Sequence, residues 1–282
     1  MFRIAGQEIY FSCPVPYLES YKVAGAEREV AAFPVDGTRT LISRMTGWVG
    51  GEMRRVETWS APPGTLLTVE GGSDCYISSG GDAIVRANET TEVTALDSEI
   101  LLGPALVLAL ALRGTWCLHA SAAVFGSHTF AFLGESGQGK STLAAYLGAS
   151  GGRRWRLATD DILPVTIGPT GVVAWPHFPQ RKLSMQAQPG TRLPERLPVD
   201  RICVLSPVDK SALPDLLLLP SRQAAQTLVS HTAGARLFDP SLLAAHLAFC
   251  AEVARQILVY KLAYPHNRDA LPKVKLLLEI TC

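Results

Sequence analysis

Charged residues are scarce in this chain of 282 residues, and neither sign is in excess. Asp, Glu, Lys and Arg make up 18% of the sequence, where about a quarter is usual for soluble proteins. The 26 basic residues nearly cancel the 25 acidic ones, which leaves a net charge of +1. Because so small a charge produces no strong field around the molecule, we expect it to bind neither nucleic acid nor an anionic membrane.

Cysteines are few, and long apolar runs are missing. The six cysteines lie at least 32 residues apart, so the chain has no CxxC pair or metal-knuckle spacing and is expected to keep reduced thiols. The first residues lack the basic and apolar regions of a signal peptide. The most apolar stretch, residues 100–112, is too short to cross a bilayer and predicts a buried helix. We therefore expect a soluble, cytoplasmic protein.

The length and the 48% of apolar residues favour two domains with sizeable cores. Residues 1–98 contain short runs rich in Thr, Val and Ser, at 65–70, 75–78 and 83–86, separated by glycine turns. This pattern predicts a mostly β N-terminal domain. It contains no recognisable catalytic constellation, and its role is left open between oligomerisation, substrate docking and cover for the second domain.

Residues 99–282 predict a second domain of α/β character. A helix is expected at 100–113, with Pro104 in its first turn. A strand-like run at 115–125 and a second strand at 129–133 then suggest a β-hairpin. Near the end of the sequence, a helix at 242–253 precedes a strand at 256–262.

A glycine-rich loop follows this hairpin and carries the strongest functional signal. It matches G-x-x-x-x-G-K-[ST] in full, between an apolar strand and a helical pattern, and it consists of Gly134, Glu135, Ser136, Gly137, Gln138, Gly139, Lys140, Ser141 and Thr142. Glycines let backbone N–H groups turn toward phosphate oxygens at a helix N-terminus. The lysine would reach the β- and γ-phosphates of a nucleotide, and the Ser141 hydroxyl would bind Mg²⁺. The alternative is an ordinary strand-to-helix turn.

Two adjacent carboxylates and one histidine accompany the loop. Asp160 and Asp161 end a short predicted strand, where one carboxylate can hold Mg²⁺ and the other can accept the proton of an attacking hydroxyl. The alternative is that one aspartate caps the following turn. His119 lies 21 residues before Lys140 in an apolar strand. Taken alone, such a histidine is more often a core residue than a catalytic one.

Together these features resemble the catalytic domain of the HPr kinase/phosphorylase family, bacterial serine kinases related in fold to phosphoenolpyruvate carboxykinase. The resemblance rests on Leu118-His119-Ala120-Ser121, on the glycine-rich loop and on Ala158-Thr159-Asp160-Asp161, and it extends from about residue 115 to a final strand that includes residues 259–265. It implies a compact α/β (α+β) core around a mixed sheet, with ATP or another nucleoside triphosphate and Mg²⁺ as cofactors.

The resemblance also implies roles for individual residues. Lys140 would bind the phosphates, and Ser141 and Asp160 the metal. One of the two aspartates would be the base, with a preference for Asp161, and His119 would position or shuttle the proton. Arg236 is a candidate for the arginine that stabilises charge during transfer, the alternative being a surface arginine.

The sequence departs from the family between residues 174 and 183. This stretch has no carboxylate and no E-[IV]-R-G motif, so the resemblance does not extend to the phosphorylase activity, to a glutamate metal ligand or to HPr as substrate. The chain looks more like the shorter kinases of lasso-peptide biosynthetic clusters. Arg181 and Lys182 are then either phosphate or peptide contacts or a solvated basic pair.

Three functions remain open from the sequence. The first is a serine kinase acting on a peptide or small protein, such as the precursor of a lasso peptide. The sequence is compatible with a homo-oligomer. The second is a kinase of a small molecule, such as a sugar or an amino-acid alcohol, because the motifs bind the nucleotide and not the acceptor. The third is a nucleotide-binding regulatory or scaffold protein, although such a protein has no need of a base.

Overall fold

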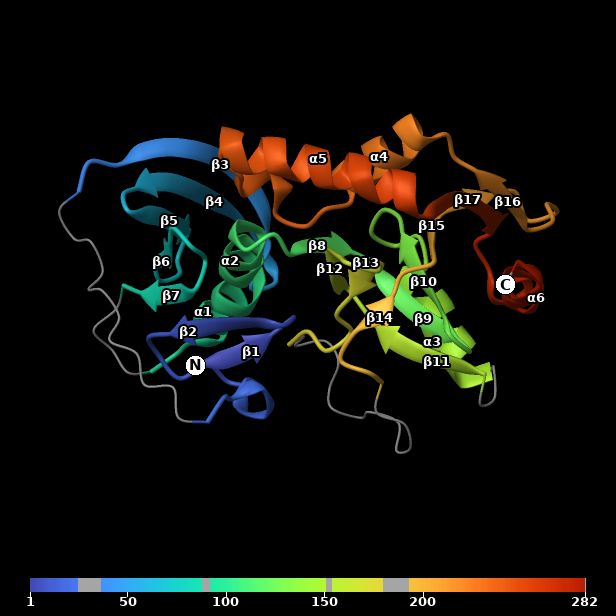
Figure 1. Cartoon of the computed structure of the whole chain (residues 1–282), viewed down its shortest axis with the longest axis horizontal. Helices are drawn as coiled ribbons and strands as arrows, with labels where there is room; N and C mark the ends of the chain where they lie inside the picture. Colours follow the sequence, from blue (N-terminus) through green and yellow to red (C-terminus); the bar gives the residue numbers. More distant parts are fainter. Residues whose placement is uncertain (25–36, 88–91, 151–153, 180–192, 282) are drawn as a thin grey trace. The chain divides into compact units, whose positions relative to one another are not determined.

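The structure is a computed structural model that describes residues 1–24, 37–87, 92–150, 154–179 and 193–281. The chain forms two compact units (Figure 1). Among the described residues, the first unit contains Met1–Cys117 and Gly234–Ala245, and most of the rest, including Leu118–Phe178, belongs to the second. The division near residue 117 differs from the boundary expected at residue 98.

The first unit is built on a seven-stranded sheet. Its strand order is β1-β2-β7-β6-β5-β4-β3, with neighbours antiparallel except for β2 and β7. The strands are β1 (Phe2–Ile4), β2 (Gln7–Phe11), β3 (Thr40–Val49), β4 (Glu52–Ala61), β5 (Gly64–Val69), β6 (Cys75–Ser78) and β7 (Ala83–Arg86). The three strands predicted from the sequence are present as β5, β6 and β7. A short helix, η1 (Glu19–Tyr21), follows β2 in the sequence.

The apolar segment before residue 113 belongs to this unit and is not one regular helix. It consists of α1 (Ala95–Ile100), the π-helical turn η2 (Leu101–Ala105) and α2 (Leu106–Leu112). The prediction that Pro104 lies in the first turn is wrong. The helix begins earlier because Thr94 and Asp97 form a capping box, and the proline is accommodated mid-helix by the turn and the non-helical backbone of Gly103.

The same segment, Ala95–Leu112, is apolar and long enough to be considered as a membrane span. Its mean hydropathy is 1.8, yet 67% of it is buried inside the structure. The part formed by α2 contacts β6 and β7. A mostly buried apolar helix of this kind is typical of a protein core.

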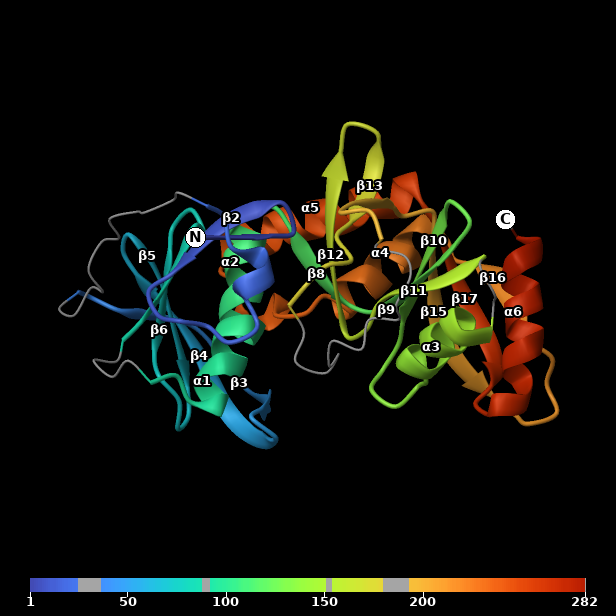
Figure 2. The same ribbon diagram turned by 90° about the horizontal axis from the view of Figure 1, so that it is seen from below.

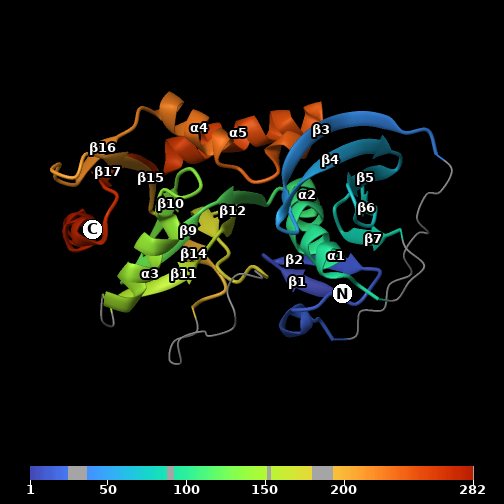
Figure 3. The ribbon, with the colours of Figure 1, turned by 180° about the vertical axis from the view of Figure 1, so that it is seen from behind.

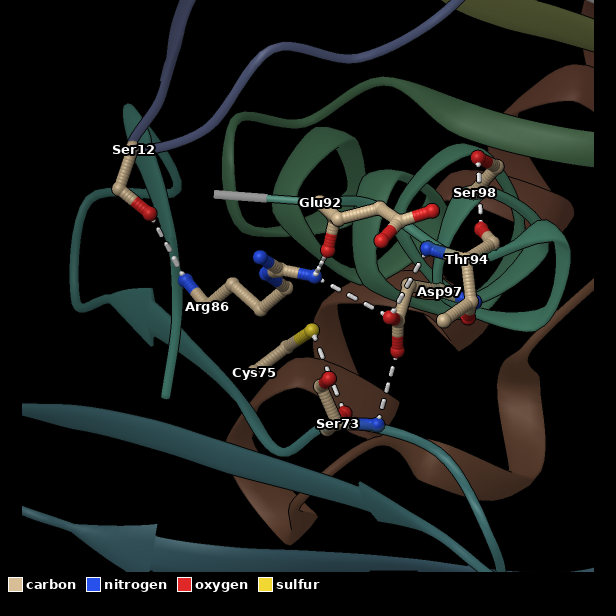
Figure 4. Close-up of polar contacts among 8 residues, drawn as sticks. All are labelled: Ser12, Ser73, Cys75, Arg86, Glu92, Thr94, Asp97 and Ser98. Atoms are coloured by element: carbon tan, nitrogen blue, oxygen red, sulfur yellow. Dashed lines mark hydrogen bonds and ion pairs between the residues drawn. The ribbon is translucent and has the colours of Figure 1, made fainter. Parts of the chain in front are cut away.

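A buried ion pair connects this helical segment to the sheet (Figure 4). Arg86 Nη1, on β7, lies 3.1 Å from Asp97 Oδ2, on α1, and both side chains are almost completely buried. The other carboxylate oxygen accepts a hydrogen bond of 2.9 Å from the backbone N–H of Ser73, and the same guanidinium nitrogen donates to the carbonyl of Glu92. Charges removed from water in this way are stabilised by each other and by the hydrogen bonds around them.

The second unit contains a mixed six-stranded sheet, as expected from the resemblance. Its order is β11-β9-β10-β15-β17-β16. The strands are β9 (Ser121–Phe125), β10 (His128–Leu133), β11 (Trp155–Thr159), β15 (Arg201–Val208), β16 (Asp215–Leu218) and β17 (Leu258–Pro265). The helices α3 (Lys140–Ser150) and α6 (Leu271–Ile280) lie beside this sheet (Figure 2). They share a core with it that includes Phe130, Phe132, Leu143, Trp155 and Leu278.

The remaining strands form a four-stranded sheet of order β14-β13-β12-β8. It consists of β8 (Trp116–His119), β12 (Ile162–Gly168), β13 (Gly171–Ala174) and β14 (Leu197–Pro198). The single strand-like run expected at 115–125 is therefore two strands, β8 and β9, in different sheets. They separate at Ala120, whose N–H donates to the carbonyl of Asp161.

The remaining helices are α4 (Ser221–Ser230), η3 (Ala235–Leu237), α5 (Pro240–Gln256) and η4 (Arg268–Ala270) (Figure 3). The predicted helix at 242–253 is present within α5, which begins two residues earlier because the side chain of Asp239 accepts hydrogen bonds from the N–H of Leu242 and the hydroxyl of Ser241. The final strand is confirmed as β17.

Candidate active site

Four strands of the second unit end at the same edge of its six-stranded sheet. β10, β15 and β17 are parallel, and β11 runs in the same direction because both it and β10 are antiparallel to β9. The glycine-rich loop (residues 134–142) follows β10, the aspartate pair follows β11, and His266 follows β17. The topology therefore gathers these three segments, which lie far apart in the sequence.

The glycines of the loop have backbone conformations that a side chain would not allow. Gly134, Gly137 and Gly139 have φ angles of 152°, 84° and 90°, in the region that glycine alone enters freely. A Cβ atom on Gly139 would also lie 3.0 Å from His266 Nε2 and 3.2 Å from the hydroxyl of Tyr264. The loop is thus both turned and closely packed at the residue before Lys140.

Lys140 is turned back into the loop. Its side chain is buried, and Nζ donates hydrogen bonds of 2.8 Å to the carbonyl of Gly134 and 3.1 Å to that of Glu135. The N–H of Glu135 in turn donates to Gln138 Oε1 at 2.9 Å. The ammonium group of Lys140 and the backbone N–H of Glu135 therefore lie within the same short loop. Both are hydrogen-bond donors from which phosphate oxygens can accept.

Asp160 and Asp161 differ in their partners. Asp160 Oδ1 accepts a hydrogen bond of 2.6 Å from the hydroxyl of Ser121, the first residue of β9. Asp161 Oδ1 lies 3.4 Å from His119 Nδ1, and the two side chains are 30% and 38% exposed, so that a solute can reach them. The sequence placed the two carboxylates side by side, and the structure gives each of them a different neighbour.

The backbone at Asp161 is strained. Its φ is 75°, and the N–H of Ile162 donates across it to the carbonyl of Asp160, which closes a three-residue turn. Such conformations cost about 1–3 kcal/mol in residues other than glycine. The carbonyl of Asp161 is fixed by the N–H of Ala120, so the strain is maintained by the link to β8 and holds the carboxylate toward His119.

His231 is a functional candidate that sequence reasoning missed. Its carbonyl accepts a hydrogen bond of 2.8 Å from the N–H of His119. Burial lowers the pKa of His231, while Glu135 raises it and Lys140 and His119 lower it. The electrostatic influence of Glu135 and Lys140 on this pKa indicates that the imidazole lies within range of the loop. His266, which belongs to no sequence motif, also packs against Gly139. No local sequence pattern identifies His231 or His266 as a site residue, because their positions depend on how the strands and helices pack.

The donors near the loop fit a magnesium ion bound with a nucleotide. Among the described residues, no group of three or more His, Cys, Asp or Glu side chains forms a metal cage. Mg²⁺ does not need one, because it is usually held by one or two protein oxygens together with phosphate oxygens and water. The Ser141 hydroxyl and the Asp160 carboxylate are oxygen donors of this kind.

Of the three basic residues predicted outside the loop, the structure describes Arg236 alone. Arg236 lies in η3, in the first unit, and its carbonyl accepts a hydrogen bond of 2.5 Å from the hydroxyl of Ser43. A role for Arg236 in phosphoryl transfer stays a prediction. Arg181 and Lys182 lie outside the described residues.

Comparison with known proteins gives little beyond these motifs. No protein-family model and no curated protein matches the chain. One similar solved structure is the Hpr(Ser) kinase/phosphatase from Coxiella burnetii, at 15% sequence identity and a TM-score of 0.35, covering 58% of this chain and 95% of that one.

Proposed function

We propose that this protein is an ATP- and Mg²⁺-dependent kinase that transfers a phosphoryl group to a serine of a peptide or small protein. The observation that supports the proposal best is the position of the His119–Asp161 pair at the sheet edge that also carries the glycine-rich loop. A nucleotide-binding scaffold needs the loop but has no need of a carboxylate held in a strained turn beside a histidine.

The loop would hold the nucleotide by its phosphates. Lys140 would exchange its two carbonyl acceptors for phosphate oxygens, and Ser141 and Asp160 would hold the metal. Bound Mg²⁺ would supply neutralisation of the phosphate charge. The hydrogen bond from Ser121 fixes the direction of the Asp160 carboxylate before any ligand arrives.

The acceptor hydroxyl would approach Asp161. Its carboxylate would take the hydroxyl proton as the new oxygen–phosphorus bond forms and the bond from the γ-phosphorus to the β–γ bridging oxygen breaks, which releases ADP. His119 Nδ1, 3.4 Å away, would orient the carboxylate and can receive the proton afterwards. Most of the rate would come from placing the two substrates and neutralising charge, as in other phosphoryl transfers.

Two substitutions test this assignment with labelled ATP and a library of serine peptides. We expect Lys140→Ala and Asp161→Asn each to reduce transfer by about 100-fold or more without a change in folding. Lys273→Ala and Asp215→Asn, at exposed positions of the same unit, are matched controls and should transfer normally. Transfer at the wild-type rate by either site variant would contradict the proposal.

The same assay separates the acceptor classes. Label on serine peptides supports a peptide or protein substrate, whereas label on free serine or a polyol with none on peptides supports a small-molecule kinase. Nucleotide binding without label on any acceptor would instead indicate a scaffold.

A further inference from the structure

A buried histidine that the proposed mechanism does not use lies close behind the site. His246, on α5, is completely buried, and its Nε2 atom lies 2.8 Å from the hydroxyl of Thr232 and 3.2 Å from Cys250 Sγ. Burial lowers the pKa of His246, which favours the neutral ring. Burying a polar side chain costs free energy unless its polar atoms form hydrogen bonds.

The direction of these hydrogen bonds follows from Thr232. Its hydroxyl donates to the carbonyl of Leu228 at 2.9 Å. The single hydroxyl proton is then in use, so we assign the oxygen as the acceptor and the proton of His246 to Nε2. His246 is thereby a donor that holds Thr232 in place from the side of α5.

Thr232 connects this contact to the candidate active site. It pairs with Leu118 of β8 in an isolated antiparallel bridge. The preceding residue, His231, accepts the hydrogen bond from the N–H of His119, whose ring lies beside Asp161. The path from His246 to Asp161 therefore runs through hydrogen bonds and one β-bridge of the second unit.

We propose that His246 is a positioning residue that holds the segment His231–Thr232 against β8 and so aims His119 at Asp161. The kinetic part of this inference rests on the proposed kinase function, whereas the structural part does not. His246 touches no reacting atom, and its effect is transmitted by Thr232.

Paired variants at Thr232 separate this role from a general loss of stability. Thr232→Val keeps the shape but removes the acceptor for His246, and Thr232→Ser retains it. Thr58→Val is the matched control. Thr58 is buried in the first unit, and its hydroxyl donates to the carbonyl of Leu237 in that same unit. His246→Leu and His246→Gln form a second pair, in which the glutamine keeps an N–H donor.

Two measurements are made on each full-length variant. In Thr232→Val and His246→Leu we expect the backbone amide of His119 to exchange with solvent at least about tenfold faster by NMR, and kcat to fall by about tenfold with an unchanged KM for ATP. Thr232→Ser and His246→Gln should behave like the wild type, and Thr58→Val should change neither readout.

Unchanged exchange of the His119 amide in Thr232→Val and in His246→Leu would overturn the proposal. An equal fall of kcat in Thr58→Val would do the same, because the effect would then be general. If the wild-type protein transfers no phosphate, the kinase proposal fails, and the amide exchange still decides whether His246 positions His119.

Discussion

At the scale of single residues, the glycines shape the loop because they have no side chain. Gly139 combines a φ of 90° with a neighbouring imidazole 3.0 Å from where a Cβ would lie. The motif in the sequence predicts a glycine that brings the backbone close to phosphate. The structure adds that the same glycine makes room for His266 and Tyr264 from the end of β17.

We expect Gly139→Ala to weaken nucleotide binding by about tenfold or more, because both the backbone and the packed imidazole oppose the new methyl group. Gly126→Ala is the control: its φ is 60° but nothing lies within 4 Å of the added Cβ, so it should cost only the backbone strain of about 1–2 kcal/mol. Calorimetric titration with a non-hydrolysable ATP analogue, and denaturant unfolding, measure the two effects. Equal nucleotide affinity in both variants would show that the packing at His266 is unimportant.

At the scale of elements, the ion pair between Arg86 and Asp97 is the clearest link between a helix and a sheet. Removing one member of a buried pair leaves the other charge uncompensated, which costs about 3–5 kcal/mol. We therefore expect Asp97→Ala to lower the free energy of unfolding of the first unit by about this amount. The exposed pair of Arg3 and Glu8 is a matched comparison, and Glu8→Ala should cost at most about 1 kcal/mol in denaturant unfolding.

The same carboxylate predicts how stability depends on pH. Burial opposes the charged form of Asp97, but hydrogen bonds from Ser73 and Thr94 outweigh burial and hold its pKa below the ordinary value. Because the folded protein has the lower pKa, this contribution is present above the pKa of the unfolded chain, about 3.9, and is lost as the pH falls through the folded value. Thermal unfolding between pH 7 and pH 3 should show a steeper loss of stability in the wild type than in Asp97→Asn; equal slopes for both proteins would contradict the prediction.

At the scale of the whole molecule, the two units are not consecutive pieces of sequence. The first takes in Gly234–Ala245 from far along the chain, where Phe238 packs on Trp116 with ring centroids 5.6 Å apart. The apolar segment Ala95–Leu112 also belongs to it. A boundary near residue 98, expected from the change in composition, cuts through α1, within the core of this unit.

Truncation tests this division. We expect a chain of residues 99–282 to bind the dye ANS and to associate, because the buried face of α2 loses the strands β6 and β7 that cover it. The full-length protein, measured alongside by fluorescence and light scattering, should bind less dye and associate less than this chain. A monomeric 99–282 chain without dye binding would mean that the sequence boundary was adequate after all.

Local patterns in the sequence were enough for the parts of the site that are contiguous. The glycine-rich loop, its position between β10 and α3, and the aspartates after β11 follow from motifs of a few residues, because backbone conformation and helix starts depend on near neighbours. The break of the run 115–125 at Ala120 was not predictable in this way, since the N–H of Ala120 donates to the carbonyl of Asp161, 41 positions further along.

The sequence by itself therefore determined the chemistry that is available, namely a loop suited to phosphate, two carboxylates and a histidine. Only the tertiary structure decided which groups meet: His119 with Asp161, Ser121 with Asp160, and His231 and His266 near the loop. It also assigned Arg236 to the other unit. The physical reason is that such contacts join residues that are tens of positions or more apart, so they depend on strand order and direction in the sheet, which no local pattern specifies.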